Sequence, residues 1–146
     1  MCNNNRYYVF MRDPLPLLPG YSLRRAANAT AARLASRLAE LGLRQVDASV
    51  LILVGENPKV TASALGRQLD IQRANMVPLL KRLEDAGLID RIPLDKKSQG
   101  LVLTAKGLKD TKKAHDLIDV FESEMLDRIP EQHREHLLPA LDALWR

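Results

Sequence analysis

The fold of this chain is decided by two stretches, Thr61-Ala-Ser-Ala-Leu-Gly-Arg-Gln-Leu69 and Arg73-Ala-Asn-Met-Val-Pro-Leu-Leu-Lys-Arg-Leu-Glu-Asp-Ala86. The first predicts a short helix with Thr61 as its N-cap. The second predicts a helix whose apolar residues recur at spacings of three and four, which places one face inward: Met76, Leu79, Leu80 and Leu83. Between them, residues 70–72 predict a tight turn. The two stretches together predict a helix-turn-helix unit.

The hydrophobic period changes after Gly87, which ends the second helix. Leu88 to Leu94 and Leu101 to Thr104 predict two strands, and the polar, basic stretch from Asp95 to Gly100 predicts the turn between them. A short helix, a turn, a second helix and a basic hairpin, in that order, predict a winged helix-turn-helix.

Further helices are predicted on both sides of this unit. They run from about Ser22, as N-cap, to Glu40, from Arg44 to Val54, from Ala105 to Asp127, and from Pro130 to Trp145. The third has an apolar face that includes His115. In a monomer the helices over residues 22–40, 105–127 and 130–145 would expose apolar stripes, so we expect a homodimer in which both chain ends pair. The predicted fold class is mainly α with a small β-hairpin wing, flanked by N- and C-terminal dimerisation helices.

Charge is concentrated in the middle of the chain. The 146 residues have a net charge of +4, and residues 57–106 alone contain 9 basic and 5 acidic residues. The N-terminal 56 residues contribute +3 and residues 107–146 contribute −3, so the two flanks cancel. A basic segment between neutralised flanks indicates a polyanionic partner.

Several function classes are excluded or disfavoured by composition. Cys2 is the single cysteine, so an internal disulfide and a Cys-x-x-Cys metal site are impossible. The longest apolar run, Val50 to Val54, is too short to span a membrane, and no signal peptide is recognisable, so we expect a cytoplasmic protein. No catalytic motif is present, and we expect neither enzyme activity nor a cofactor. His133 and His136 share a helix face but lack further ligands, so no metal site is predicted.

From about residue 22 to residue 145 the chain resembles the MarR-type winged helix-turn-helix transcriptional regulators. Three stretches determine the resemblance: residues 61–69, the run from Asn75 to Ile89 with its "RLE..GLI" ending, and the run from Asp90 to Gly107 with its "LT..G" exit. The resemblance implies a homodimer that binds a pseudo-palindromic operator in double-stranded DNA and is released by a small ligand or an oxidant. We expect residues 1–19 to form an arm, residues 20–56 and 107–146 the dimerisation region, and residues 57–106 the DNA-binding region.

The candidate DNA-binding residues follow from this assignment. Arg73 can donate two hydrogen bonds to guanine, Asn75 can pair with adenine, and Val77 can contact a thymine methyl group. The remaining candidates are phosphate contacts and outward-facing cations: Thr61, Ser63, Arg67, Gln72, Lys81 and Arg82. Arg67 and Arg82 are equally compatible with pairing to nearby acids. Cys2 has no evident basic pocket, and we do not expect it to sense oxidants.

The wing tip departs from the family pattern. Lysines stand at Lys96 and Lys97 where the family often has arginine, and Ser98 completes the tip. Because lysine lacks the planar guanidinium fork, we expect the wing to contact phosphate more than base sequence. The resemblance also places an effector pocket between the dimerisation helices and the helix-turn-helix, where Arg24, Asn28 and His115 are candidates for a small aromatic or carboxylate effector. The alternative function is a winged-helix protein-interaction module without specific DNA binding.

Overall fold

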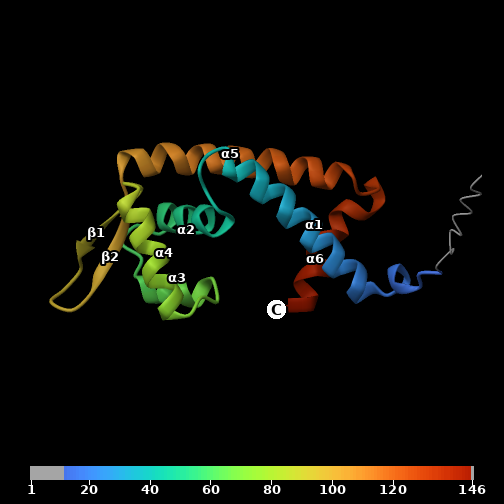
Figure 1. The fold of residues 1–146 in the computed structure, drawn as a ribbon, viewed down its shortest axis with the longest axis horizontal. Coiled ribbons are helices and arrows are strands. Elements are labelled where there is room, and N and C mark those ends of the chain that lie inside the picture. The colour runs from blue at the N-terminus through green and yellow to red at the C-terminus, as the bar shows by residue number, and fades with distance from the viewer. Residues whose placement is uncertain (1–11, 146) are drawn as a thin grey trace, which may run out of the picture. The chain divides into compact units, whose positions relative to one another are not determined.

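The computed structural model describes residues 12–145. Within those residues the chain forms, in order, η1 (Leu15–Leu17), α1 (Pro19–Ala39), α2 (Gln45–Glu56), α3 (Ala62–Gln68), α4 (Arg73–Asp85), β1 (Ile89–Pro93), β2 (Gln99–Leu103), α5 (Ala105–Asp127) and α6 (Glu131–Trp145) (Figure 1). The chain divides into two compact units whose described parts are residues 12–33 and 34–145, with the boundary inside α1. The core and the hairpin belong to the second unit.

The first unit corrects the expected start of α1. The helix begins at Pro19, so Ser22 lies inside it and is not its N-cap; the Ser22 hydroxyl donates to the carbonyl of Pro16 over 3.0 Å. Proline suits the first helical position, because its fixed φ is helical and no N–H is needed there. A 3-10 turn over Leu15–Leu17 precedes α1. Cys2 and the other residues from 1 to 11 of the expected arm lie outside the described part of the chain.

The core of the second unit joins the helix-turn-helix to the helices around it. Leu38 at the end of α1, Leu51 of α2, Leu65 of α3, Leu80 of α4 and Leu101 of β2 are all fully buried in one cluster. Helix α2 packs against α5 and β2, while α4 packs against α3 and β1 (Figure 1). Helix α4, the second helix of the helix-turn-helix unit, therefore rests on a continuous apolar base.

The predicted wing is confirmed. Strands β1 and β2 are antiparallel, and their register pairs Ile89 with Leu103 and Pro93 with Gln99. Strand β1 is one residue shorter than expected at each end, while β2 begins two residues before its expected start and ends one residue before its expected end. Val60 forms an isolated bridge with Leu101, so the segment before α3 lies along β2. Gly87 ends α4 at φ 68°, in the left-handed region that glycine tolerates.

Helix α5 corrects the placement of His115. Its buried seam follows Gly107, Ala114 and Phe121, which are seven residues apart. The His115 side chain lies off this seam, 52% exposed, with Nδ1 3.0 Å from a carboxylate oxygen of Asp119. Counting large apolar residues missed the seam because two of its members are small. The expectation that His115 lies on the apolar face is therefore wrong.

The last helix leaves apolar side chains in solvent. Helix α6 begins directly after Pro130, as predicted, and continues through Pro139. Leu138, Leu144 and Trp145 are all more than 60% exposed in the single chain. The expected exposure of an apolar stripe on this flanking helix is confirmed.

Candidate nucleic-acid interface

A groove of about 990 Å³ lies between α3, the turn after it, α4 and the hairpin. Nine of the residues selected from sequence line it: Thr61, Ser63, Arg67, Gln72, Arg73, Val77, Lys96, Lys97 and Ser98. Three others, Asn75, Lys81 and Arg82, are not among its lining residues. The fold thus brings most of the predicted contact residues to one concave surface.

The turn between α3 and α4 depends on two backbone features. Asp70 adopts the left-handed conformation, with φ 52°, and the N–H of Ile71 then donates to the carbonyl of Gly66 over 2.8 Å. A Cβ at Gly66 would lie 2.9 Å from the carbonyl oxygen of Ile71, so the tight turn needs glycine there. At the start of α3, the Thr61 hydroxyl accepts from the N–H of Ala64 over 3.2 Å and acts as the predicted N-cap.

Helix α4 presents two chemically different faces. Its inward residues Met76, Leu79, Leu80 and Leu83 are buried, as predicted. The other residues between positions 73 and 81 are all exposed: Arg73, Ala74, Asn75, Val77, Pro78 and Lys81. Val77 is 57% exposed, and it lines the groove together with Arg73 at the start of the helix. This combination of one apolar and several donor groups suits the edges of base pairs.

The wing tip is held by one carboxylate. Asp95 accepts from the N–H of Lys97 over 2.7 Å and from the N–H and hydroxyl of Ser98 over 2.8 and 2.5 Å. The Ser98 hydroxyl and these two N–H groups lower the pKa of Asp95 below its ordinary value, because all three donate to the ionised form. These hydrogen bonds therefore fix the backbone of the turn from which the two exposed lysine side chains extend.

The groove has a net positive lining. It contains five cationic side chains, Arg67, Arg73, Arg91, Lys96 and Lys97, against two carboxylates, those of Asp70 and Asp95. Sequence reasoning missed Arg91 and Asp70, because their place in the groove depends on how the hairpin and the turn fold against α4. Concentrated positive charge on a concave surface attracts polyanions, and the attraction weakens with salt.

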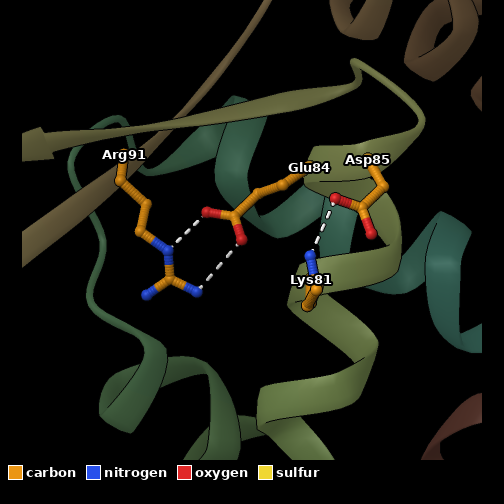
Figure 2. Close-up of polar contacts among 4 residues, drawn as sticks. All are labelled: Lys81, Glu84, Asp85 and Arg91. Atoms are coloured by element: carbon orange, nitrogen blue, oxygen red, sulfur yellow. Dashed lines mark hydrogen bonds and ion pairs between the residues drawn. The ribbon is translucent and has the colours of Figure 1, made fainter.

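Arg91 ties the hairpin to the recognition helix. Its guanidinium pairs with the carboxylate of Glu84 on α4 through Nε and Nη2, the latter at 3.3 Å (Figure 2). One turn away, Lys81 pairs with Asp85 over 3.1 Å (Figure 2). The first contact joins two elements and the second joins neighbours on one helix. The wing and α4 are therefore linked by charge as well as by packing.

Both arginines among the predicted phosphate contacts have side-chain partners within the protein. Arg82 pairs with the buried carboxylate of Asp47 on α2, and Arg67 donates to the Ser63 hydroxyl over 3.1 Å. Of the two alternatives that the sequence left open for Arg82, the structure favours pairing with an acid. Asn75 and Arg82 border a second hollow of about 520 Å³.

The remaining candidates lie on the long helices. Arg24 and Asn28 are exposed on α1, where the Arg24 guanidinium lies 5.4 Å from the centre of the Tyr21 ring. His133 and His136 are exposed on α6, and residues 12–145 contain no cluster of three or more His, Cys, Asp or Glu side chains suited to a metal ion. Across the same described range, every helix is too short or too polar to cross a membrane.

Comparison with known proteins identifies the family. The profile of the MarR family matches residues 41–98, from the end of α1 to the wing tip. The transcriptional repressor CouR, solved bound to a 23-mer DNA duplex, is 30% identical; the match covers 93% of this chain and 99% of CouR, with a TM-score of 0.85. This chain belongs to the MarR family. The predicted family and winged-helix fold are thus confirmed.

Other relatives of this MarR-family chain are regulators as well. The HTH-type transcriptional repressor Rv2887 of Mycobacterium tuberculosis is 25% identical over 136 residues, which cover 92% of this chain and 96% of Rv2887. A regulatory protein for the hcr operon of Thauera aromatica is 26% identical over 99 residues, so the match spans only 60% of that relative. CouR was also solved bound to p-coumaroyl-CoA, at 28% identity and a TM-score of 0.82.

Proposed function

We propose that this MarR-family chain is a transcriptional repressor that binds a pseudo-palindromic operator as a homodimer in the cytoplasm. The observation that supports this most directly is the groove, in which the exposed face of α4 and a basic wing tip are presented together. Membership of a regulator family supports the same function and gives no support to an enzyme. No cofactor is part of the proposal.

Base recognition is assigned to α4. Arg73 would donate both arms of its guanidinium to O6 and N7 of guanine, and Asn75 would bond N6 and N7 of adenine. Val77, exposed two residues after Asn75 on the same helix, would contact a thymine methyl group. These three side chains are the proposed source of sequence specificity.

Phosphate contacts are assigned to the rest of the surface. The proposed residues are Thr61, Ser63, Arg67, Gln72, Lys81, Arg82, Lys96, Lys97 and Ser98. Lys96 and Lys97 can neutralise phosphates along the groove but cannot form the planar, two-pronged contacts of arginine. Arg82 is the weakest member, because its guanidinium is already paired with Asp47.

The homodimer is supported by the uncovered apolar side chains. Leu138, Leu144 and Trp145 on α6 would be buried by a second copy of the chain, which removes their exposure to water. Two recognition helices related by a two-fold axis can read half-sites about 34 Å apart, one turn of DNA. Residues 20–56 and 107–146 remain the proposed dimerisation region, with residues 57–106 as the DNA-binding region and residues 1–19 as the arm.

Release from DNA is assigned to a small aromatic or carboxylate effector. CouR bound to p-coumaroyl-CoA supports an aromatic acid or its CoA thioester as the chemical class. Arg24, Asn28 and His115 remain the proposed effector contacts; the exposure of His115 in the single chain leaves its imidazole available to a ligand. Binding would change the separation of the two recognition helices and so weaken operator affinity.

Selection from a random DNA duplex library, followed by fluorescence anisotropy titrations at several salt concentrations, tests the proposal. An enriched inverted repeat and an affinity that falls steeply with salt are expected. Arg73→Lys keeps the charge but loses the fork, so it should lower affinity for the selected site roughly tenfold while leaving non-specific binding unchanged. Arg128→Lys, at an exposed position directly after α5 and outside the groove, is the matched control. If no sequence is enriched and binding is weak for the wild type, the alternative of a protein-interaction module replaces the repressor.

A further inference from the structure

Lys59 has an unusual backbone conformation. Among residues 12–145, positive φ occurs at Gly42, Gly87, Asp70 and Lys59, and the value at Lys59 is 73°. Glycine adopts this region without steric conflict, and aspartate tolerates it because its short side chain bonds the local backbone. Lysine has neither property. The chain therefore holds a long cationic side chain at a position where glycine would be more stable.

The surrounding fold imposes this conformation. The N–H of Lys59 donates to the carbonyl of Leu101 over 2.9 Å, and the N–H of Leu101 donates to the carbonyl of Val60 over 2.9 Å. A Cβ on Gly100 would lie 2.6 Å from the carbonyl oxygen of Lys59, so the two backbones are in close contact. The backbone of Lys59 thus pairs with the edge of β2, and this pairing does not depend on which side chain the position has.

The side chain of Lys59 is exposed, and residues next to it in the fold line the groove, although Lys59 itself is not among the lining residues. Thr61, two residues later, and Gln99, next to Gly100 on β2, both line the groove. Within the described part of the chain, no carboxylate pairs with the Lys59 ammonium. A solvated, uncompensated cation therefore stands at the edge of a surface that is already net positive.

We propose that Lys59 is a DNA-binding residue that contacts a backbone phosphate beside the wing, and that lysine, in place of glycine, occupies this strained position for that contact. The proposal rests on the proposed function and adds a contact from the segment before α3. Backbone strain in a folded protein persists where the structure determines it, and it accumulates at functional sites. An ammonium at this edge would neutralise a phosphate without reading the base sequence.

The test separates strain from charge with three variants. Lys59→Gly removes both, so its melting temperature should rise above that of the wild type while its affinity for a duplex falls. Lys59→Gln removes only the charge, and Lys59→Arg keeps it. Lys109→Gln, at an exposed site on α5 outside the groove, is the control for a change of one unit of net charge.

Anisotropy titrations of each variant on a duplex from the selection, or on a random duplex, give the readout. Lys59→Gly and Lys59→Gln should each bind roughly fivefold more weakly at 0.1 M salt, and the slope of log K against log salt should fall by about 0.9 per lost contact, about 1.8 for a dimer. Lys59→Arg and Lys109→Gln should match the wild type within about twofold.

Equal slopes for the wild type and Lys59→Gln would overturn the proposal, as would a Lys59→Gly variant that is less stable than the wild type. In both cases the wild type still binds DNA, so the proposed function stands. A wild type without salt-dependent binding to any duplex would overturn both the proposed function and the role of Lys59.

Discussion

The carboxylate of Asp47 on α2 and the guanidinium of Arg82 on α4 form an ion pair across the two helices. Asp47 is 3% exposed and is the one buried charged residue in the described part of the chain. It accepts from Nη1 of Arg82 at 3.2 Å, from Nη2, and from the N–H of Arg44 at 2.8 Å. A buried charge is stable only when it is paired, so this contact fixes α4 against the start of α2.

Arg82→Leu should lower the free energy of unfolding by about 3 kcal/mol, because it leaves the Asp47 carboxylate buried without its partner. Chemical denaturation measures the change. Replacing both residues, Asp47→Leu with Arg82→Met, should be less destabilising than Arg82→Leu alone. Lys81→Met, which breaks the exposed pair with Asp85, is the control and should change stability by less than about 1 kcal/mol. Equal effects of Arg82→Leu and Lys81→Met would contradict the assigned role.

Gly107 and Gly55 should respond differently to alanine. A Cβ on Gly107 would lie 1.9 Å from the carbonyl oxygen of Leu88, a backbone atom that cannot move aside easily. We expect Gly107→Ala to destabilise the fold by about 3 kcal/mol or more. On α2, a Cβ at Gly55 meets only side-chain atoms, those of Leu103 at 3.2 Å and Thr111 at 4.0 Å, and alanine favours the helix by up to about 1 kcal/mol. Thermal melts in which both variants lose stability equally would refute the close contact.

The recognition helix could be predicted from sequence because its pattern is local. Met76, Leu79, Leu80 and Leu83 recur at helical spacing, and their burial fixes which side chains face outward. Gly87 likewise ended α4 where its position after the last apolar residue indicated. At these positions, the helical spacing of apolar residues or the turn preference of a glycine is enough to predict the local structure.

The predictions from sequence are wrong or incomplete where packing between residues distant in the chain decides which side chains are buried or reach the groove. The seam of α5 uses Gly107 and Ala114, which contribute little hydrophobic signal, so His115 was placed on the wrong face. Arg91 and Asp70 reach the groove through the fold of the hairpin and the turn, which no local spacing encodes. For Arg82, the sequence allowed an acidic partner but did not indicate Asp47, 35 residues away.

Asp70→Asn should strengthen DNA binding. The Asp70 carboxylate lines the groove and would repel phosphates, while asparagine tolerates the same left-handed backbone. We expect roughly two- to fivefold tighter binding at low salt, with the gain shrinking as salt screens the interaction. Anisotropy titrations at 0.05 and 0.3 M salt measure it. Glu122→Gln on α5 makes the same charge change outside the groove, and an equal gain from that control would mean that only net charge matters.

The wing tip should lose its internal hydrogen bonds in acid. The hydroxyl of Ser98 and the N–H groups of Lys97 and Ser98 lower the pKa of Asp95, so these contacts stabilise the folded tip above the ordinary pKa, about 4. Their contribution is lost as the pH falls through the lowered pKa, when the carboxylate takes up a proton. The amide resonances of Lys97 and Ser98 should therefore titrate with a midpoint below that of an exposed aspartate. Asp95→Asn should abolish this titration, and a midpoint at or above the ordinary value would contradict the hydrogen-bond pattern.

Leu144→Glu should separate the proposed dimer. Leu144 is exposed on the apolar side of α6, where a second copy would bury it, so a carboxylate there would lose its hydration on association. Sedimentation equilibrium should show a monomer, and affinity for the inverted repeat should fall at least 100-fold, because one recognition helix then binds each half-site independently. His136→Glu places the same charge on the other side of α6 and should remain dimeric. If Leu144→Glu dimerises as strongly as the wild type, α6 is not part of the interface.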